Sequence, residues 1–231
     1  MTYCMEEVPP ERKVTAMSAE RKADRRTLYT RQVIKDALLE LLEKSPYVKI
    51  NVTALCKQAE ITRATFYLHY GDLNDVLDEV IREALDIAEH SVESGEYAIR
   101  RAMLMCTLKN GPDALKGNEQ FLAPCQRIAD HPKYRALFMD DSLSYYIIRK
   151  IYLAERTGSV PGIARQCRIS EEDADRLFMF MIYGLYYVNR SMKWEKSDDW
   201  YRMQYIVNHV LENGLDSVSA LPGDYKQKRE G

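Results

Sequence analysis

The stretch that decides the fold is INVTALCKQAEITRATFYLHYGDLNDVL, residues 50–77. Asn51 can cap one short helix, and Thr62 can cap a second helix that runs to about Tyr70. A tight break at Glu60 separates the two helices. Two short helices joined by a tight turn are the plan of a helix-turn-helix, so the sequence predicts that motif here.

The second of these helices has an unusual outward face. If Phe66 points inward and each residue turns the helix by about 100°, Tyr70 joins it in the core and Arg63 lies at the margin. An exposed helix of this length usually carries charges on its outer side. Here the outward positions hold small, apolar and hydroxyl-bearing side chains, namely Ala64, Thr65, Tyr67 and Leu68.

These side chains suit the major groove of DNA. Ala64 and Leu68 can contact thymine methyl groups, Tyr67 can contact a base edge or a phosphate, and Arg63 can bind guanine O6 and N7. Phosphate contacts, which fix position without identifying bases, are predicted for Thr62, Thr65 and His69. The alternative interpretation is an ordinary helical hairpin with no role in DNA binding.

The segment also resembles the DNA-binding domain of the TetR family of transcriptional repressors. The matching parts are the turn AEIT at 59–62, the helix TFYLHY at 65–70 and the start of the next helix, DLNDVL, at 72–77. The resemblance covers roughly residues 28–90, and beyond them only the expected architecture is similar. It implies a base-contacting face of Arg63, Ala64, Tyr67 and Leu68, phosphate contacts from Thr65, Tyr67 and His69, and a DNA contact from Thr53 on the preceding helix.

Two departures from the family pattern lead to predictions. Glu60 stands where the family usually has glycine, so a glutamate is expected in a backbone conformation that glycine adopts at lower cost. Gly71 and Leu73 stand where family members often have lysines. A phosphate contact at the start of the helix that follows would therefore come from its backbone amides.

Charge is distributed unevenly along the 231 residues, although the net charge is only -2. Residues 12–35 carry eight Lys and Arg against Glu20 and Asp24, and residues 72–93 carry eight acids against one arginine. We interpret residues 1–24 as a flexible basic arm, because they show no helical periodicity. The arm either contributes to DNA binding or is an ordinary solvated tail.

The second half is predicted to form the contacts of a homodimer. Residues 177–188 are apolar on nearly all sides, and such a helix must be covered on all sides. Two helices from each of two chains would form a four-helix bundle, and two-fold symmetry then predicts a palindromic operator. The predicted interface residues are Phe178, Met181, Leu185, Trp200, Met203, Ile206, Val207 and Val210.

Aromatic and methionine side chains in the same half suggest a site for a small apolar or aromatic effector. The predicted lining is Met103, Met105, Tyr145, Tyr146, Tyr152, Phe180, Tyr183 and Tyr187. The alternative is a plain aromatic core with no ligand.

Other functional classes find little support in the sequence. The five cysteines are widely spaced without a C-x-x-C pair, so neither a disulfide framework nor a zinc cluster is expected. There is no nucleophile elbow, phosphate loop or metal-binding pair, so we expect no enzyme, cofactor or metal. The longest apolar run is shorter than the roughly 20 residues that span a bilayer. We expect a cytoplasmic protein.

Taken together, the sequence predicts an all-α protein of about nine to ten helices. Its expected parts are a basic arm (1–24), a helix-turn-helix domain (25–72), a helical dimerisation and ligand-binding domain (73–216) and a flexible tail (217–231). The expected function is that of a repressor on double-stranded DNA, released by an effector. The alternatives are the same fold controlled by a protein partner, and a helical interaction module or enzyme that has lost DNA binding.

Overall fold

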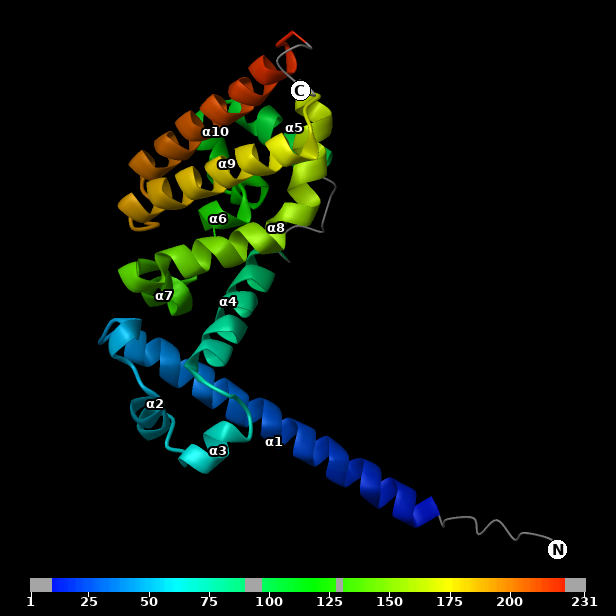
Figure 1. Ribbon diagram of the computed structural model, residues 1–231, viewed down its shortest axis with the longest axis vertical. Coiled ribbons are helices and arrows are strands. Elements are labelled where there is room, and N and C mark those ends of the chain that lie inside the picture. Colours follow the sequence, from blue (N-terminus) through cyan, green and yellow to red (C-terminus); the bar gives the residue numbers. More distant parts are fainter. Residues whose placement is uncertain (1–9, 90–96, 128–130, 223–231) are drawn as a thin grey trace, which may run out of the picture. The chain divides into compact units, whose positions relative to one another are not determined.

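The computed structural model describes residues 10–89, 97–127 and 131–222 (Figure 1). Within these residues the chain forms α-helices and short 3-10 helices, with no strand. The prediction of an all-α fold is confirmed. None of the described helices combines the length and apolar character needed to cross a bilayer.

The described residues fall into two compact units. The first contains α1 (Pro10–Leu42), α2 (Val52–Gln58), α3 (Arg63–Tyr67) and the part of α4 (Leu73–Glu89) that ends at Glu79. Its core is formed by side chains that are almost fully shielded from solvent: Ile34, Leu38, Leu55, Phe66, Val76 and Leu77. The boundary lies inside α4, after Glu79, and not before that helix as the sequence suggested.

Helix α1 corrects the prediction for the N-terminal arm. Residues 10–24, which were expected to lack helical structure, belong to α1, whereas residues 1–9 lie outside the described part. The segment contains many alanines, arginines, lysines and glutamates, which favour helix, and its only proline is at the first helical position. It lacks an apolar stripe, so periodicity could not reveal it.

The second unit begins at Val80 and also includes Pro46–Val48. Its longer helices are α5 (Tyr97–Leu108), α8 (Ser144–Cys167), α9 (Glu171–Ser191) and α10 (Asp198–Ser219). The shorter elements are η1 (Tyr47–Lys49), η2 (Pro112–Leu115), η3 (Glu119–Phe121), α6 (Pro124–Arg127), η5 (Pro132–Tyr134), α7 (Arg135–Met139) and η6 (Asp141–Leu143).

One helix in this unit contains an internal proline, and one helix boundary differs from expectation. Pro161 lies inside α8, and Figure 1 shows α8 bending along its length, as a helix does around an internal proline. Helix α10 continues to Ser219, so the predicted tail starts later than residue 217. Residues 223–231 of that tail lie outside the described part.

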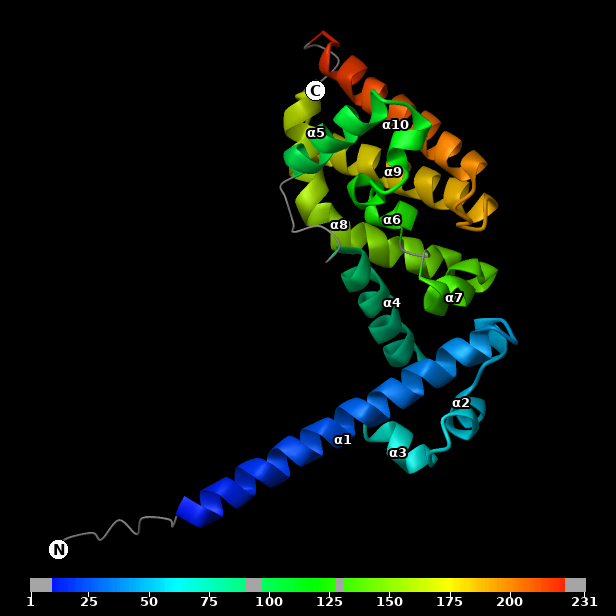
Figure 2. The same ribbon diagram turned by 180° about the vertical axis from the view of Figure 1, so that it is seen from behind.

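Helices α9 and α10 run side by side, with α5 and α6 on one side of them (Figures 1 and 2). The facing side chains form part of the core of this unit, which includes Leu104, Leu108, Leu115, Leu122 and Trp200. The packing of neighbouring helices against one side of this pair decides which faces of α9 and α10 are buried.

Candidate nucleic-acid interface and internal cavity

Local hydrogen bonds hold the helix-turn-helix in shape. The side chain of Asn51 accepts a bond from the backbone N–H of Ala54, and Thr62 accepts one from Thr65. Both predicted caps are confirmed. Such caps satisfy backbone donors that have no partner within the helix, so each stabilises its helix by about 1 kcal/mol.

The turn between α2 and α3 is a Schellman motif. The N–H of Ile61 donates to the carbonyl of Cys56 at 3.0 Å, and the N–H of Glu60 donates to Lys57 at 3.3 Å. Glu60 has φ 52°, in the left-handed region that favours glycine. The prediction of a glutamate in a glycine-like conformation is confirmed.

Replacing Glu60 with glycine should stabilise the first unit. The left-handed conformation costs a residue with a Cβ about 1–2 kcal/mol, and glycine loses about 0.5–1 kcal/mol more backbone entropy on folding. We therefore expect a net gain of roughly 0.5–1 kcal/mol, measured by urea unfolding. Glu60→Ala, which removes the charge and keeps the Cβ, is the control and should show no such gain. A Glu60→Gly protein no more stable than the alanine variant would contradict the strain.

Side chains of α3 divide between core and surface as the sequence predicted. Phe66 and Tyr70 are buried, while Arg63, Ala64 and the cap Thr62 are exposed. The largest apolar groups on the outer side are 51% exposed in Tyr67 and 81% exposed in Leu68. Of the remaining predicted contacts, Thr53 is exposed, and Thr65 and His69 are half-buried.

Arg63 lies against Tyr67, one helical turn away. Its guanidinium carbon is 5.9 Å from the centre of the Tyr67 ring, and its Nη2 donates to the Tyr67 hydroxyl at 3.4 Å. The hydroxyls of Thr62 and Thr65 are 2.9 Å apart. The outer side of α3 and its flanking residues therefore present one cation, three hydroxyls and the exposed apolar side chain of Leu68.

Glu79 joins three parts of the first unit in a way the sequence did not predict. It accepts bonds from Arg31, from Lys35 Nζ at 3.2 Å and from the Tyr70 hydroxyl at 2.9 Å. Burial alone would raise the pKa of Glu79, but these donors outweigh it and lower the pKa to about 2. The carboxylate thus remains ionised at neutral pH and ties α4 to α1 and to Tyr70, which lies three residues beyond the end of α3.

This cluster changes the interpretation of the basic residues between positions 12 and 35. Lys35 is only 4% exposed, and Arg31 lies over the Tyr70 ring at 4.8 Å while it bonds Glu79. Two of the eight basic residues therefore serve the interior of the unit. Arg31 and Lys35 both lie more than 40 residues from Glu79 in the chain, so no local pattern could predict this pairing.

The start of α4 corrects another prediction. Asp72 Oδ1 accepts bonds from the N–H groups of Asn74 and Asp75, at 2.7 and 3.1 Å. Asp75 Oδ2 in turn accepts from Gly71 and Asp72, at 2.7 and 3.3 Å. The amides expected to bind a phosphate are thus occupied by carboxylates, whose negative charge also repels phosphate.

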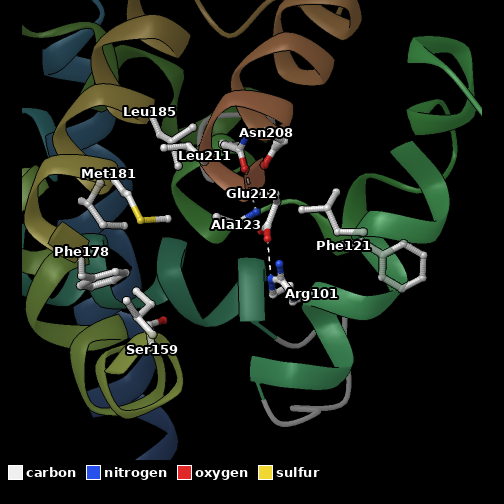
Figure 3. Close-up of a pocket in the computed structure, with 14 residues that line it drawn as sticks. Arg101, Phe121, Ala123, Ser159, Phe178, Met181, Leu185, Asn208, Leu211 and Glu212 are labelled. Carbon is white, nitrogen blue, oxygen red and sulfur yellow. Dashed lines mark hydrogen bonds and ion pairs between the residues drawn. The ribbon is translucent and has the colours of Figure 1, made fainter. Parts of the chain in front are cut away.

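The second unit contains a cavity of about 70 Å³ (Figure 3). Its walls come from α5, η3, α6, α8, α9 and α10, and most of the lining side chains are apolar, including Phe121, Phe178 and Met181. Two charged side chains, Arg101 and Glu212, also line it. About 150 Å³ holds one benzene molecule, so only a small ligand fits unless the helices separate.

None of the eight residues predicted to line an effector site borders this cavity. Met103, Tyr145, Phe180 and Tyr187 are instead exposed, while Met105, Tyr146, Tyr152 and Tyr183 are half-buried elsewhere. The physical reason is the register of the helices. Aromatic content identified the correct helices, but the faces that point inward carry other side chains.

The predicted dimer residues also divide into two groups. Phe178, Leu185 and Trp200 are buried within the single chain, which corrects their assignment to an interface, whereas Met181 is half-buried and borders the cavity. Ile206 and Val210 of α10 are exposed, and Met203 and Val207 are half-buried on the same helix. On α9 the accessible apolar side chains are Met179, Phe180, Tyr183 and Tyr187.

The inward face of α10 carries polar side chains beside the apolar Trp200, Tyr201 and Leu215. Gln204, Asn208 and Glu212 are spaced four residues apart and are all buried. Gln204 donates to Asn189 Oδ1 at 3.1 Å and accepts from Gln126 at 2.7 Å, and Trp200 Nε1 also donates to Asn189, at 2.9 Å. The i, i+4, i+8 spacing of these polar residues was visible in the sequence. We expected apolar side chains to point inward, so this signal was missed.

The fold and this geometry define a helix-turn-helix protein with a helical second unit. Over 115 residues the chain is 31% identical to the uncharacterized HTH-type transcriptional regulator YxbF of Bacillus subtilis (strain 168). The match covers 46% of this chain and 29% of that protein, so the chain spans less than a third of that relative's length. No protein-family model matches the chain. The similarity supports a regulator of the helix-turn-helix type at a coarse level.

Proposed function

We propose that the chain is a TetR-like transcriptional repressor that binds a palindromic DNA site as a homodimer and is released by a small-molecule effector. Its role is binding and not catalysis. The observation that carries the proposal is the outer side of α3. Arg63, Tyr67 and Leu68 are exposed there on a helix whose N-cap and preceding turn are fixed by hydrogen bonds.

Exposed apolar and aromatic groups are costly in water unless they meet a partner, and a large exposed patch marks an interaction site. Ala64 and Leu68 suit thymine methyl groups, and Arg63 suits guanine. Thr53, Thr62, Thr65 and His69 lie on α2, on α3 or beside α3, where they can reach phosphates. The resemblance to the TetR DNA-binding domain and the similarity to an HTH-type regulator both agree with this assignment.

A second copy of the chain is the partner that best suits the outer faces of α9 and α10. Phe180 is 69% exposed and Val210 is 67% exposed, and Ile206 and Tyr187 are exposed on the same two helices. Helices α5 and α6 cover the opposite side (Figure 2). A self-complementary contact between two such faces buries both at once, and it gives the two-fold symmetry that a palindromic site requires.

The cavity of the second unit is the place proposed for the effector. An effector can release DNA only if its affinity differs between the DNA-bound and the free form of the protein. The cavity lies among α5, η3, α6, α8, α9 and α10, so a ligand that enlarges it must move at least one of these elements.

A gel shift with the DNA upstream of the chain's own coding region, at several salt concentrations, tests the proposal. We expect a specific complex whose affinity falls about 10³-fold or more between 50 and 200 mM salt, because phosphate contacts release bound cations. DNA of the same length and random sequence is the control. Equal affinity for the two DNAs would contradict sequence-specific recognition.

A further inference from the structure

The charged side chains at and beside the cavity include one base, Arg101, and two acids, Glu212 and Asp216. Arg101 Nε donates to Glu212 Oε2 at 2.5 Å, and Arg101 Nη2 donates to Asp216 Oδ1 at 2.8 Å. Glu212 is buried and borders the cavity, whereas the side chain of Asp216 is exposed to solvent. One guanidinium therefore faces two carboxylates, so the set carries a net charge of -1 (Figure 3 shows Arg101 and Glu212).

We propose that the effector is a small organic cation, whose ammonium group binds Glu212 and whose apolar body lies against Phe178 and Met181. This inference rests on the proposed function, because it names the class of ligand for the effector site. The ligand class follows from the excess of one negative charge and from the apolar side chains that form most of the cavity wall.

An incoming ammonium group can replace Arg101 at Glu212 without leaving either charge alone. Arg101 keeps its bond to Asp216, and Glu212 gains a new donor, so the net charge of the site becomes zero. A carboxylate ligand would have to take Arg101 away from Glu212. It would leave a buried carboxylate without its cation beside a second anion, which is strongly unfavourable. The site therefore selects cations over anions.

The environment of Glu212 supports this exchange. Burial raises the pKa of Glu212, and the charge of Arg101 opposes that rise only in part. The carboxylate therefore gains from any further cation that reaches it.

The size of the cavity limits the ligand. About 70 Å³ admits a group of a few non-hydrogen atoms, so a longer ligand must push apart elements that line the cavity. The Arg101–Glu212 pair links two of these elements, α5 and α10. Exchange of this pair for an ammonium would thus also remove a link between α5 and α10. Binding and a change in helix packing would be coupled through the same two side chains.

n-Butylamine, n-butanol and butyrate form a matched set of probes with one apolar tail and three different charges. We would titrate each into the full chain at constant ionic strength and pH 7, and measure binding by saturation-transfer NMR. We expect n-butylamine to bind at least about tenfold more tightly than n-butanol, as for a hydrogen bond to a charged group, and butyrate to bind most weakly. Equal binding of the amine and the alcohol, or preference for butyrate, would overturn the proposal.

Two variants test the assignment to Glu212. Glu212→Gln keeps the shape and removes the charge, so it should abolish the preference for the amine over the alcohol. Asp216→Asn alters an exposed side chain that accepts bonds from Arg101 and Gln166, and it should weaken amine binding several-fold because Arg101 then stays with Glu212. Glu172→Gln, an exposed carboxylate on α9, is the control and should have no effect. Unchanged amine selectivity in a folded Glu212→Gln or in Asp216→Asn would overturn the assignment.

The gel shift on the same preparations separates the two proposals. Specific DNA binding without amine selectivity would overturn the ligand class alone. Amine selectivity without specific DNA binding would overturn the repressor function and leave a cation-binding site.

Discussion

Replacing Arg63 and Tyr67 together with alanine is expected to remove sequence-specific DNA binding and leave the fold intact. Both side chains are exposed, and a hydrogen bond of 3.4 Å joins them to each other. A bidentate arginine–guanine contact discriminates against a wrong base about tenfold or more, and a dimer makes it twice. We therefore expect at least about a hundredfold loss for the operator in a gel shift.

The same measurement separates base recognition from general attraction to DNA. Affinity for random DNA should fall far less than affinity for the operator, because phosphate contacts carry non-specific binding. Arg176→Ala removes an exposed arginine on α9 and should leave both affinities unchanged. If the double variant still preferred the operator as strongly as the parent, α3 would not be the recognition helix. Thermal unfolding monitored by circular dichroism would verify that both variants fold.

Phe180→Asp is expected to convert the proposed homodimer to a monomer. The side chain is 69% exposed in the single chain, so the aspartate is harmless there but places a charge inside the proposed interface. Loss of a central aromatic contact costs about 2 kcal/mol, and two-fold symmetry doubles it to about 4 kcal/mol, or roughly a thousandfold in the dimer Kd. Analytical ultracentrifugation at micromolar concentration would measure the change.

Met103→Asp provides the matched control for this prediction. Met103 is an exposed apolar residue of α5, outside the proposed interface, and its replacement should leave the dimer unchanged. The monomeric Phe180→Asp protein should also lose operator affinity, because one head alone contacts half of a palindrome. A parent protein that sediments as a monomer, or a Phe180→Asp protein that remains a dimer, would contradict the proposed interface.

The faces of α9 show why the second unit was harder to predict than the first. Phe178 and Phe180 are both phenylalanines in one apolar run, yet Phe178 is buried and Phe180 is exposed. Hydropathy cannot distinguish the two phenylalanines, since either side chain would be stable if it were buried. The neighbours decide, because α8 packs along α9 and its Tyr152 ring lies 5.9 Å from the ring of Phe178.

The recognition helix was predictable for the opposite reason. Its caps, its turn and its inward aromatic residues depend on bonds that span three to five residues, such as Thr62 to Thr65 and Cys56 to Ile61. Short-range geometry depends on residues that are close neighbours in the chain, so the sequence by itself determined the helix-turn-helix and its outer side. The Glu79 cluster, the polar face of α10 and the Arg101–Glu212 pair join residues far apart in the chain. Only the packing of whole helices brings such side chains together, so these features were decided by the tertiary structure.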